Sequence, residues 1–298
     1  MVYNIEKAYA SSILFHIFTK ERGIILSKEL TFEEKKAKVA RFNIIDDVYF
    51  QKMVEDREVC EEIIRVIMDD DSIIVIENHP QEPLKNIAGR SVIMDALCKD
   101  ATGRYFNVEV QKADNDNHVK RVRYIAACVT TNISEARKKF ELVPDVVAIY
   151  ISRFDMFDKG RILYRATMKL DGTFEDVDDG FEAYYVNTAV KEDSLLGELM
   201  DYFKNSEGEH PAFPNLSGRN MLFKTSQKEV GRMCEIMDME RAEGRVEGRA
   251  EGRVEERAEN CKKMHDKGMS YDEIADLLDI TSEDVKNALL LAEEGMKY

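Results

Sequence analysis

The spacing of hydrophobic residues predicts helices in the first part of the chain. Residues 46–68 carry apolar side chains three and four positions apart, which is typical of helices that pack on a core, with a break near Asp56. Residues 1–40 are also predicted to be helical, and Thr31 with Glu34 three positions later has the pattern of a capping box. We therefore expect a peripheral N-terminal segment followed by core-packing helices.

The pattern then changes to short β-branched runs and alternating positions, which predict strands. Residues 72–76 form the first such run, and a loop is expected at 80–89. Residues 91–98 and 104–112 are predicted to pair as an antiparallel hairpin around the polar turn 99–103. Because side chains alternate faces along a strand, the second strand has an apolar face with Phe106, Val108 and Val110 and a polar face with Tyr105, Asn107, Glu109 and Gln111.

The segments that follow alternate between helix and strand. We expect a helix near 116–133 capped from 114–117, strands at 145–153, 161–170 and 182–189, and a helix at 194–203 capped by Asp193 or Ser194. This succession is typical of one α/β domain. It divides the chain into an N-terminal helical segment 1–40, the α/β domain 41–205, a linker with a long charged helix 206–260, and a helical hairpin 261–298.

Composition adds three limits to this picture. The 298 residues carry a net charge of −15, yet 44% are hydrophobic, which excludes a wholly disordered chain but not a locally cationic surface. The five cysteines are odd in number and form no CxxC pair, which fits reduced thiols and a cytoplasmic location. No apolar run reaches the ~18 residues needed to cross a bilayer, so no membrane segment is expected.

Two acidic residues lie inside the predicted hairpin strands, where carboxylates are unfavourable unless something compensates their burial. Asp95 is in the first strand and Glu109 in the second, and a hairpin can bring both onto one face. Their oxygens, together with the backbone carbonyl of Val110, are ligands that suit Mg²⁺ or Mn²⁺. The alternative is two solvent-facing acids on a half-exposed sheet.

Neighbouring residues favour the metal-site interpretation. Gln111 shares the face of Glu109, and Arg121 and Tyr124 lie three positions apart on the next helix. Residues 85–123 contain eight Lys and Arg against five Asp and Glu, so the candidate site lies in a cationic stretch of an acidic chain. A polyanion could be drawn there, although ordinary solvated charge gives the same count.

The arrangement of these residues resembles the PD-(D/E)XK nuclease superfamily and, more narrowly, the Rpn family of recombination-promoting nucleases and transposases. The resemblance covers roughly residues 45–190 and rests on Asp95, on Glu109-Val110-Gln111, on 118–124, and on the segments 46–50, 86–92, 105–112 and 144–157. It implies a restriction-endonuclease-like core with a mixed central sheet flanked by helices. The helical pattern beyond residue 205 adds an all-helical C-terminal extension.

The resemblance also implies an activity. Asp95 and Glu109 would bind Mg²⁺ for the attack of water on a DNA phosphodiester. Asp47, or its neighbour Asp46, would be an auxiliary acid on the helix before the sheet. The alternative for these two acids is a stabilising charge at a helix start without any part in catalysis.

The candidate contacts to DNA lie on the helix near 116–133: His118, Lys120, Arg121 and Tyr124. Arg121 suits a phosphate because its planar guanidinium can donate two parallel hydrogen bonds. The alternatives are a structural role for Arg121 and a His118 that simply occupies the helix surface.

One residue departs from the superfamily pattern. Gln111 stands where the general motif has Lys, and the Rpn family is similar to this sequence in using Gln there. Gln can orient a water molecule but cannot transfer a proton, and acid–base help is typically worth ~10²–10⁴-fold in rate. Lys112 is a poor substitute because it points to the opposite face of the strand.

Two hypotheses follow. The first is a Mg²⁺-dependent DNA endonuclease of low sequence specificity, linked to recombination or mobile elements. The second is a catalytically weak or inactive nuclease fold that binds DNA or assembles through its C-terminal helices.

The C-terminal region leaves further alternatives open. Residues 241–258 repeat Arg, Glu, Gly and Ala or Val with a period of four. Each interior Gly costs up to ~1 kcal/mol in a helix and like charges four apart repel, so the segment either pairs with a second copy as a homodimer or is a frayed charged linker. Residues 262–291 look like a helix-turn-helix, but Glu283 and Asp284 favour a protein-contact or structural hairpin over a DNA reader.

Overall fold

The computed structural model describes residues 30–81, 83–84, 92–114, 117–135 and 137–294. Its centre is a six-stranded sheet in the order β1-β4-β5-β6-β10-β7. The strands are β1 (Val75–Pro80), β4 (Ala96–Asp100), β5 (Tyr105–Gln111), β6 (Val146–Ser152), β7 (Leu163–Ala166) and β10 (Phe181–Asn187). β5, β6 and β10 run parallel, while β1, β4 and β7 pair antiparallel with their neighbours. The predicted α/β class with a mixed sheet is therefore confirmed.

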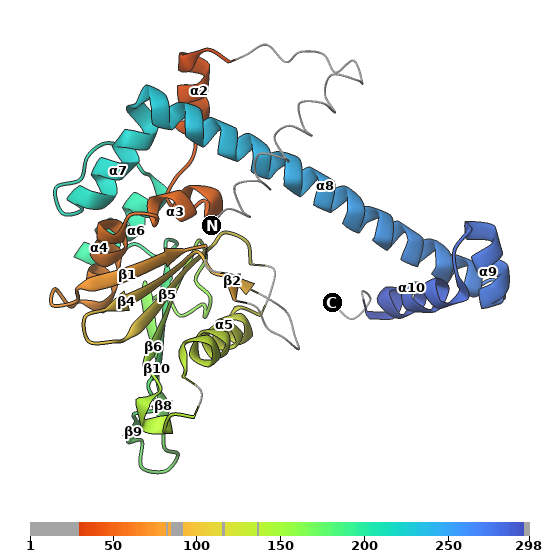
Figure 1. Ribbon diagram of the computed structural model, residues 1–298, viewed down its shortest axis with the longest axis horizontal. Helices are drawn as coiled ribbons and strands as arrows, with labels where there is room; N and C mark the ends of the chain where they lie inside the picture. Colours follow the sequence, from red (N-terminus) through yellow and green to blue (C-terminus); the bar gives the residue numbers. More distant parts are fainter. Residues whose placement is uncertain (1–29, 82, 85–91, 115–116, 136, 295–298) are drawn as a thin grey trace.

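Helices cover both faces of the sheet (Figure 1). The helices are α3 (Asp47–Met53), α4 (Arg57–Met68), α6 (Leu195–Lys204) and α7 (Pro214–Thr225) on one face, and α5 (His118–Ile133) on the other. Phe106, Val108 and Val110 of β5 belong to the main core on the α3 and α4 face. The alternation predicted for this strand is thus confirmed, and it leaves Asn107 and Glu109 on the α5 face.

Polar residues cap the N-termini of several helices at the positions that the sequence predicts. Thr31 and Glu34 form a complete capping box at the start of α2 (Phe32–Val39). Asp56 accepts a hydrogen bond from the Glu58 N–H at the start of α4, so the predicted break between the first two core helices is confirmed. Asn117 caps α5 in the same way and Ser194 caps α6. Residues 1–29 of the predicted N-terminal helical segment lie outside the described residues.

Some of the predicted strands and loops need correction. The first strand is Val75–Pro80 and not 72–76, because pairing with β4 sets its register, from Val75 opposite Asp100 to Pro80 opposite Ala96. Part of the loop expected at 80–89 is a short strand, β2 (Pro83–Leu84), which pairs with β3 (Val92–Ile93). The strand expected at 161–170 is divided into β7 and β8 (Met168–Lys169). β8 pairs with β9 (Asp176–Val177) beyond the end of the main sheet (Figure 1).

The C-terminal part is helical, as expected. α8 (Gln227–His265) starts in the core, where Val230, Met233 and Met237 are buried, and then leaves it as a long arm (Figure 1). The repeat 241–258 lies within this one helix. At its far end α9 (Tyr271–Leu278) and α10 (Ser282–Glu294) pack on α8 around a separate small cluster with Cys261 and Ile274. The main core thus continues past residue 205, and the four-part division of the chain stays a prediction.

A 3-10 helix (Phe140–Leu142) precedes β6. Within the described ranges, no helix has both the length and the apolar composition that a membrane crossing requires.

Candidate active site

Asp95 and Glu109 meet at the end of the hairpin. The β4–β5 pairing ends with Ala96 opposite Val108, and Asp95 comes directly before this pair while Glu109 comes directly after it. The Asp95 N–H donates to Glu109 Oε1 over 3.3 Å, and the Val110 N–H donates to Asp95 Oδ2 over 3.0 Å. Each carboxylate therefore binds the backbone beside the other one. Both side chains are nearly buried, with 8% of Asp95 and 3% of Glu109 exposed.

The sequence predicted Asp95 inside a strand, whereas it lies in the break between β3 and β4. The cause is hydrogen bonding with β5. The Asp95 N–H donates to the Glu109 carboxylate, and the Asp95 carboxylate accepts a hydrogen bond from the Val110 N–H. The N–H and carbonyl of one strand residue point to the same side of the strand. The Val110 carbonyl therefore faces the edge of β5 where Asp95 lies.

Burial and nearby negative charge raise the pKa of both acids. Burial raises the pKa of Glu109 well above its ordinary value, the charge of Asp95 adds to this, and Arg121 opposes it. Burial also raises the pKa of Asp95, and the nearby charge of Asp47 adds to this. The Val110 N–H and the Gln51 amide pull the Asp95 pKa in the opposite direction. Two like charges in a buried place are stable only with a compensating cation or proton.

Helix α3 contributes the third acid predicted for the site. Asp47 lies in the first turn of α3, and its own pKa is raised chiefly by desolvation. Asp46 is occupied differently: it accepts the Asn43 N–H over 2.8 Å and forms an ion pair with Lys112. Of the two neighbours, Asp47 is therefore the one whose charge acts on Asp95, while the helix-start interpretation remains compatible with its position.

Gln51 is a site residue that the sequence interpretation missed. Its amide donates to Asp95 Oδ1 over 3.0 Å, and its Oε1 accepts from the Gln81 amide over 2.6 Å. A signal existed, because Gln51 lies four positions after Asp47 and so on the same side of α3. Its contact with Asp95 bridges 44 positions of the chain, which no local pattern reveals.

On α5, Arg121 is the predicted residue that reaches the acids. Its guanidinium lies 3.9 Å from Glu109 Oε2, and 35% of its side chain is exposed. Two buried side-chain atoms of the described residues lack a hydrogen-bond partner, and both belong to neighbours of Glu109: Arg121 Nε and Asn107 Oδ1. Buried polar atoms without a partner are rare in proteins, so both of these atoms single out the surroundings of Glu109.

The other predicted residues are arranged less closely around the acids. The Gln111 amide donates to the Ala113 carbonyl over 2.9 Å, just beyond the end of β5. Lys120 is exposed in the first turn of α5. Tyr124 packs against the hydrophobic cluster beneath α5.

His118 is not a surface residue, so that expectation was wrong. Only 4% of it is exposed, its Nδ1 lies 2.8 Å from the Tyr150 hydroxyl, and its Nε2 lies 3.2 Å from Asp114. Its ring also lies 5.0 Å from that of Phe154. Both ring nitrogens are therefore used inside the protein, which favours a structural role over a contact to DNA.

The donor set fits a hard divalent cation. Within the described ranges, no group of three or more His, Cys, Asp or Glu residues is arranged to hold a metal. The ligands that remain are the carboxylates of Asp95 and Glu109 and the carbonyl of Val110, which supply oxygen only. Mg²⁺ prefers oxygen ligands and usually keeps several waters, so two carboxylates are an ordinary protein contribution.

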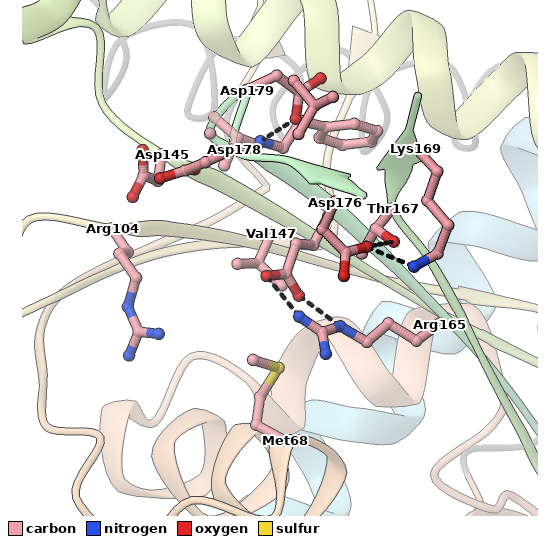
Figure 2. A pocket seen from close by; sticks show the side chains of 15 residues that line it. Met68, Arg104, Asp145, Val147, Arg165, Thr167, Lys169, Asp176, Asp178 and Asp179 are labelled. Carbon is pink, nitrogen blue, oxygen red and sulfur yellow. Dashed lines mark hydrogen bonds and ion pairs between the residues drawn. The ribbon is translucent and has the colours of Figure 1, made fainter. Parts of the chain in front are cut away.

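A pocket of about 530 Å³ lies elsewhere, at the amino ends of β6 and β10 (Figure 2). Its lining contains three cations, and each is in an ion pair: Arg104 with Asp100, Arg165 with Glu182 and Lys169 with Asp176. Glu109 and Gln111 belong to the opposite, carboxyl end of the parallel strands. This pocket is therefore separate from the acid pair.

Comparison with known families identifies the class. Residues 31–192, which are more than half of the 298 residues, match the model of the PD-(D/E)XK nuclease family transposases. The chain belongs to this family, and the predicted superfamily is confirmed. We find no significant similarity to curated protein sequences or to solved structures. The narrower Rpn assignment stays a prediction.

Proposed function

We propose that the protein is a divalent-metal-dependent DNA endonuclease of low sequence specificity, with Mg²⁺ as its metal and recombination or mobile elements as its setting. Family membership supports a nuclease-like function and a DNA substrate. The observation that carries the proposal is the pair of buried carboxylates, Asp95 and Glu109, each bonded to the backbone beside the other. The cytoplasmic location expected from the cysteines is part of the same proposal.

Each residue would have a defined role. Asp95, Glu109 and the Val110 carbonyl hold the metal, which when bound polarises the phosphate and makes water more acidic. Gln111 orients the attacking water by a hydrogen bond, and Asp47 assists by its charge beside Asp95. Arg121 binds the scissile phosphate, with Lys120 and Tyr124 as further substrate contacts on α5.

The role proposed for Arg121 follows from its surroundings. Its guanidinium is close enough to Glu109 to balance part of the negative charge, yet a third of its side chain reaches solvent. A cation that already lies beside the acid pair can bind an incoming phosphate without moving far. A bound metal would then supply the positive charge that compensates Glu109.

A plasmid-nicking assay tests the activity. The wild-type chain should nick supercoiled DNA with Mg²⁺ or Mn²⁺ and stop when EDTA is added, and Asp95→Asn should be inactive. Asp171→Asn, which changes an exposed acid at the far turn, is the matched control and should keep full activity. If the wild type fails to nick DNA with every divalent metal tried, the alternative holds: a nuclease fold that binds DNA or assembles without cutting.

We also propose that residues 241–258 of α8 pair with a second copy of the chain. An added Cβ at Gly244, Gly248 or Gly252 meets nothing within 4 Å. Residues four apart lie on one face of a helix, so the three glycines form a stripe at which a partner helix could approach closely.

Changing all three glycines to Ala tests this pairing. Ala is the better helix former by roughly 1 kcal/mol per residue, so the helix should be stabilised while a close-packed dimer is lost. Gly231→Ala, in the same helix but outside the repeat, is the control and also meets nothing within 4 Å. Sedimentation of the full-length variants measures the mass, and a monomeric wild type would contradict the pairing.

A further inference from the structure

The loop 153–161 lies beside the candidate active site. It begins where β6 ends, and the Arg153 N–H donates to the Gln111 carbonyl over 3.0 Å. It ends before β7, which starts with Leu163 opposite Val186 near the carboxyl end of β10. The loop therefore crosses the same end of the sheet that carries Glu109 and Gln111.

Asp155 holds this loop in one shape. Its carboxylate accepts the Gly160 N–H and the Tyr164 hydroxyl, both over 2.7 Å, and the Phe157 N–H over 3.3 Å. Burial alone would raise the pKa of Asp155, but these hydrogen bonds outweigh it and lower the pKa. At the far end of the loop, Asn187 donates to the Arg161 carbonyl over 2.8 Å. The loop is thus fastened by its own hydrogen bonds as well as by its ends.

Aromatic rings fasten the underside of the loop. Phe154 lies 5.0 Å from the ring of His118, which is buried at the start of α5. Phe157 lies 4.9 Å from Tyr164 and 5.2 Å from Tyr185. These contacts join the loop to α5 and to the sheet. His118 thereby links the loop to the helix that carries Arg121.

The loop displays cations that no acid neutralises. Arg153, Lys159 and Arg161 are exposed, and their side chains form no ion pair with any described residue. Lys120, in the first turn of α5, is also exposed and forms no ion pair with any described residue. Asp155 is turned inward by its bonds, which leaves Asp158 as the exposed acid of the loop. An unpaired cation can bind a phosphate without first breaking an ion pair.

We propose that Arg153, Lys159 and Arg161, together with Lys120, form a track that binds the phosphate backbone of duplex DNA and lays it across the candidate active site. This inference rests on the proposed function for its substrate. Contacts of this kind position DNA without reading its sequence, which agrees with low specificity. Binding through phosphates releases counterions, so it must weaken as salt rises.

Binding to a short labelled DNA duplex, measured by fluorescence anisotropy in EDTA over a range of salt, tests the track apart from cleavage. The triple variant Arg153→Gln, Lys159→Gln, Arg161→Gln should bind at least about tenfold more weakly at low salt. Its slope of log affinity against log salt should shrink by about 1 for each lost contact. In nicking assays KM should rise while kcat is kept.

Two matched variants sharpen the test. Lys204→Gln, Lys228→Gln, Lys267→Gln removes three exposed charges away from the carboxyl ends of β6 and β10 and should bind as the wild type does. Asp158→Asn should bind more tightly, and its left-handed backbone, with φ of 51°, suits Asn. The track is overturned if the loop triple binds like the wild type, or if the control triple weakens binding equally. A wild type that binds DNA but never nicks it would overturn only the proposed hydrolysis.

Discussion

At the carboxyl ends of β5 and β6 two acids are buried side by side, whereas at the amino ends of β6 and β10 the three cations of the pocket are each matched by an acid. The first end is poorly compensated within the protein itself, and the second is balanced by its own ion pairs (Figure 2). A protein can keep uncompensated buried charge only where something else stabilises it. The concave pocket is therefore a weaker indication of chemistry than the nearly buried acid pair.

The exposed charges around the two ends of the sheet also differ. Beside the acids, the loop 153–161 presents cations that are unpaired within the described residues. Around the pocket, five acids accompany the three cations, so the surface would repel a polyanion. The pairing of charges, more than the shape of the surface, therefore separates the two ends.

The largest effect should come from exchanging one acid at each end. Glu109→Gln should lower the nicking rate by at least about 100-fold, because a metal ligand is expected to matter more than its outer partners. The variant should melt no lower than the wild type in EDTA, since it removes like-charge repulsion between buried groups. Glu182→Gln should leave nicking unchanged. Equal nicking by both variants would remove the distinction between the two ends.

A smaller effect is expected from the residue that holds Asp95 in place. Gln51→Met removes the amide that donates to Asp95 Oδ1 while keeping the length of the side chain. Metal affinity measured by calorimetry should fall by about 10–100-fold, and high Mg²⁺ should restore nicking. Gln81→Met, which removes only the partner of Gln51, should shift the affinity less. Unchanged affinity in Gln51→Met would show that Asp95 needs no such support.

These residues show how far the sequence alone could go. The alternation in β5 placed Glu109 on the polar face, and the predicted hairpin indicated that Asp95 could share that face. Both inferences use only local periodicity and turn geometry, which the chain carries in short segments. Val110, Gln111, Arg121 and Tyr124 were inferred from the same local patterns and Asp47 from the family resemblance. The roles of all these residues, including the acid pair, remain predictions.

What the sequence could not supply depends on contacts between distant segments. Gln51 meets Asp95 across 44 positions, and His118 meets Tyr150 across 32. The edge strand β1 contains Glu77 and Asn78 and begins later than its apolar run, because its register is set by β4. Tertiary pairing therefore overrode local propensity at each of these places.

A still smaller effect should follow from loosening the loop 153–161. Asp155→Ala removes a negative charge, so simple electrostatics predicts tighter DNA binding. If the loop must be held in shape, binding should instead weaken by about three- to tenfold, since the freed side chains must be ordered again on binding. Anisotropy in EDTA distinguishes the two directions, and Asp158→Asn controls for the lost charge. Tighter binding by Asp155→Ala would show that charge alone governs this surface.

The smallest effect on stability is expected from a variant in the pocket at the amino ends of β6 and β10. Arg165→Gln breaks the two hydrogen bonds to Glu182, at 2.8 and 2.9 Å, but the pair is largely exposed, so the loss should be below about 1 kcal/mol. Arg165 lowers the pKa of Glu182, so this stability is present above the unfolded pKa and is lost as pH falls through the folded value. Urea unfolding should therefore separate the variant from the wild type at neutral pH and not below about pH 3. Nicking should be unchanged, and a loss of activity in Arg165→Gln would mean that the pocket takes part in the reaction after all.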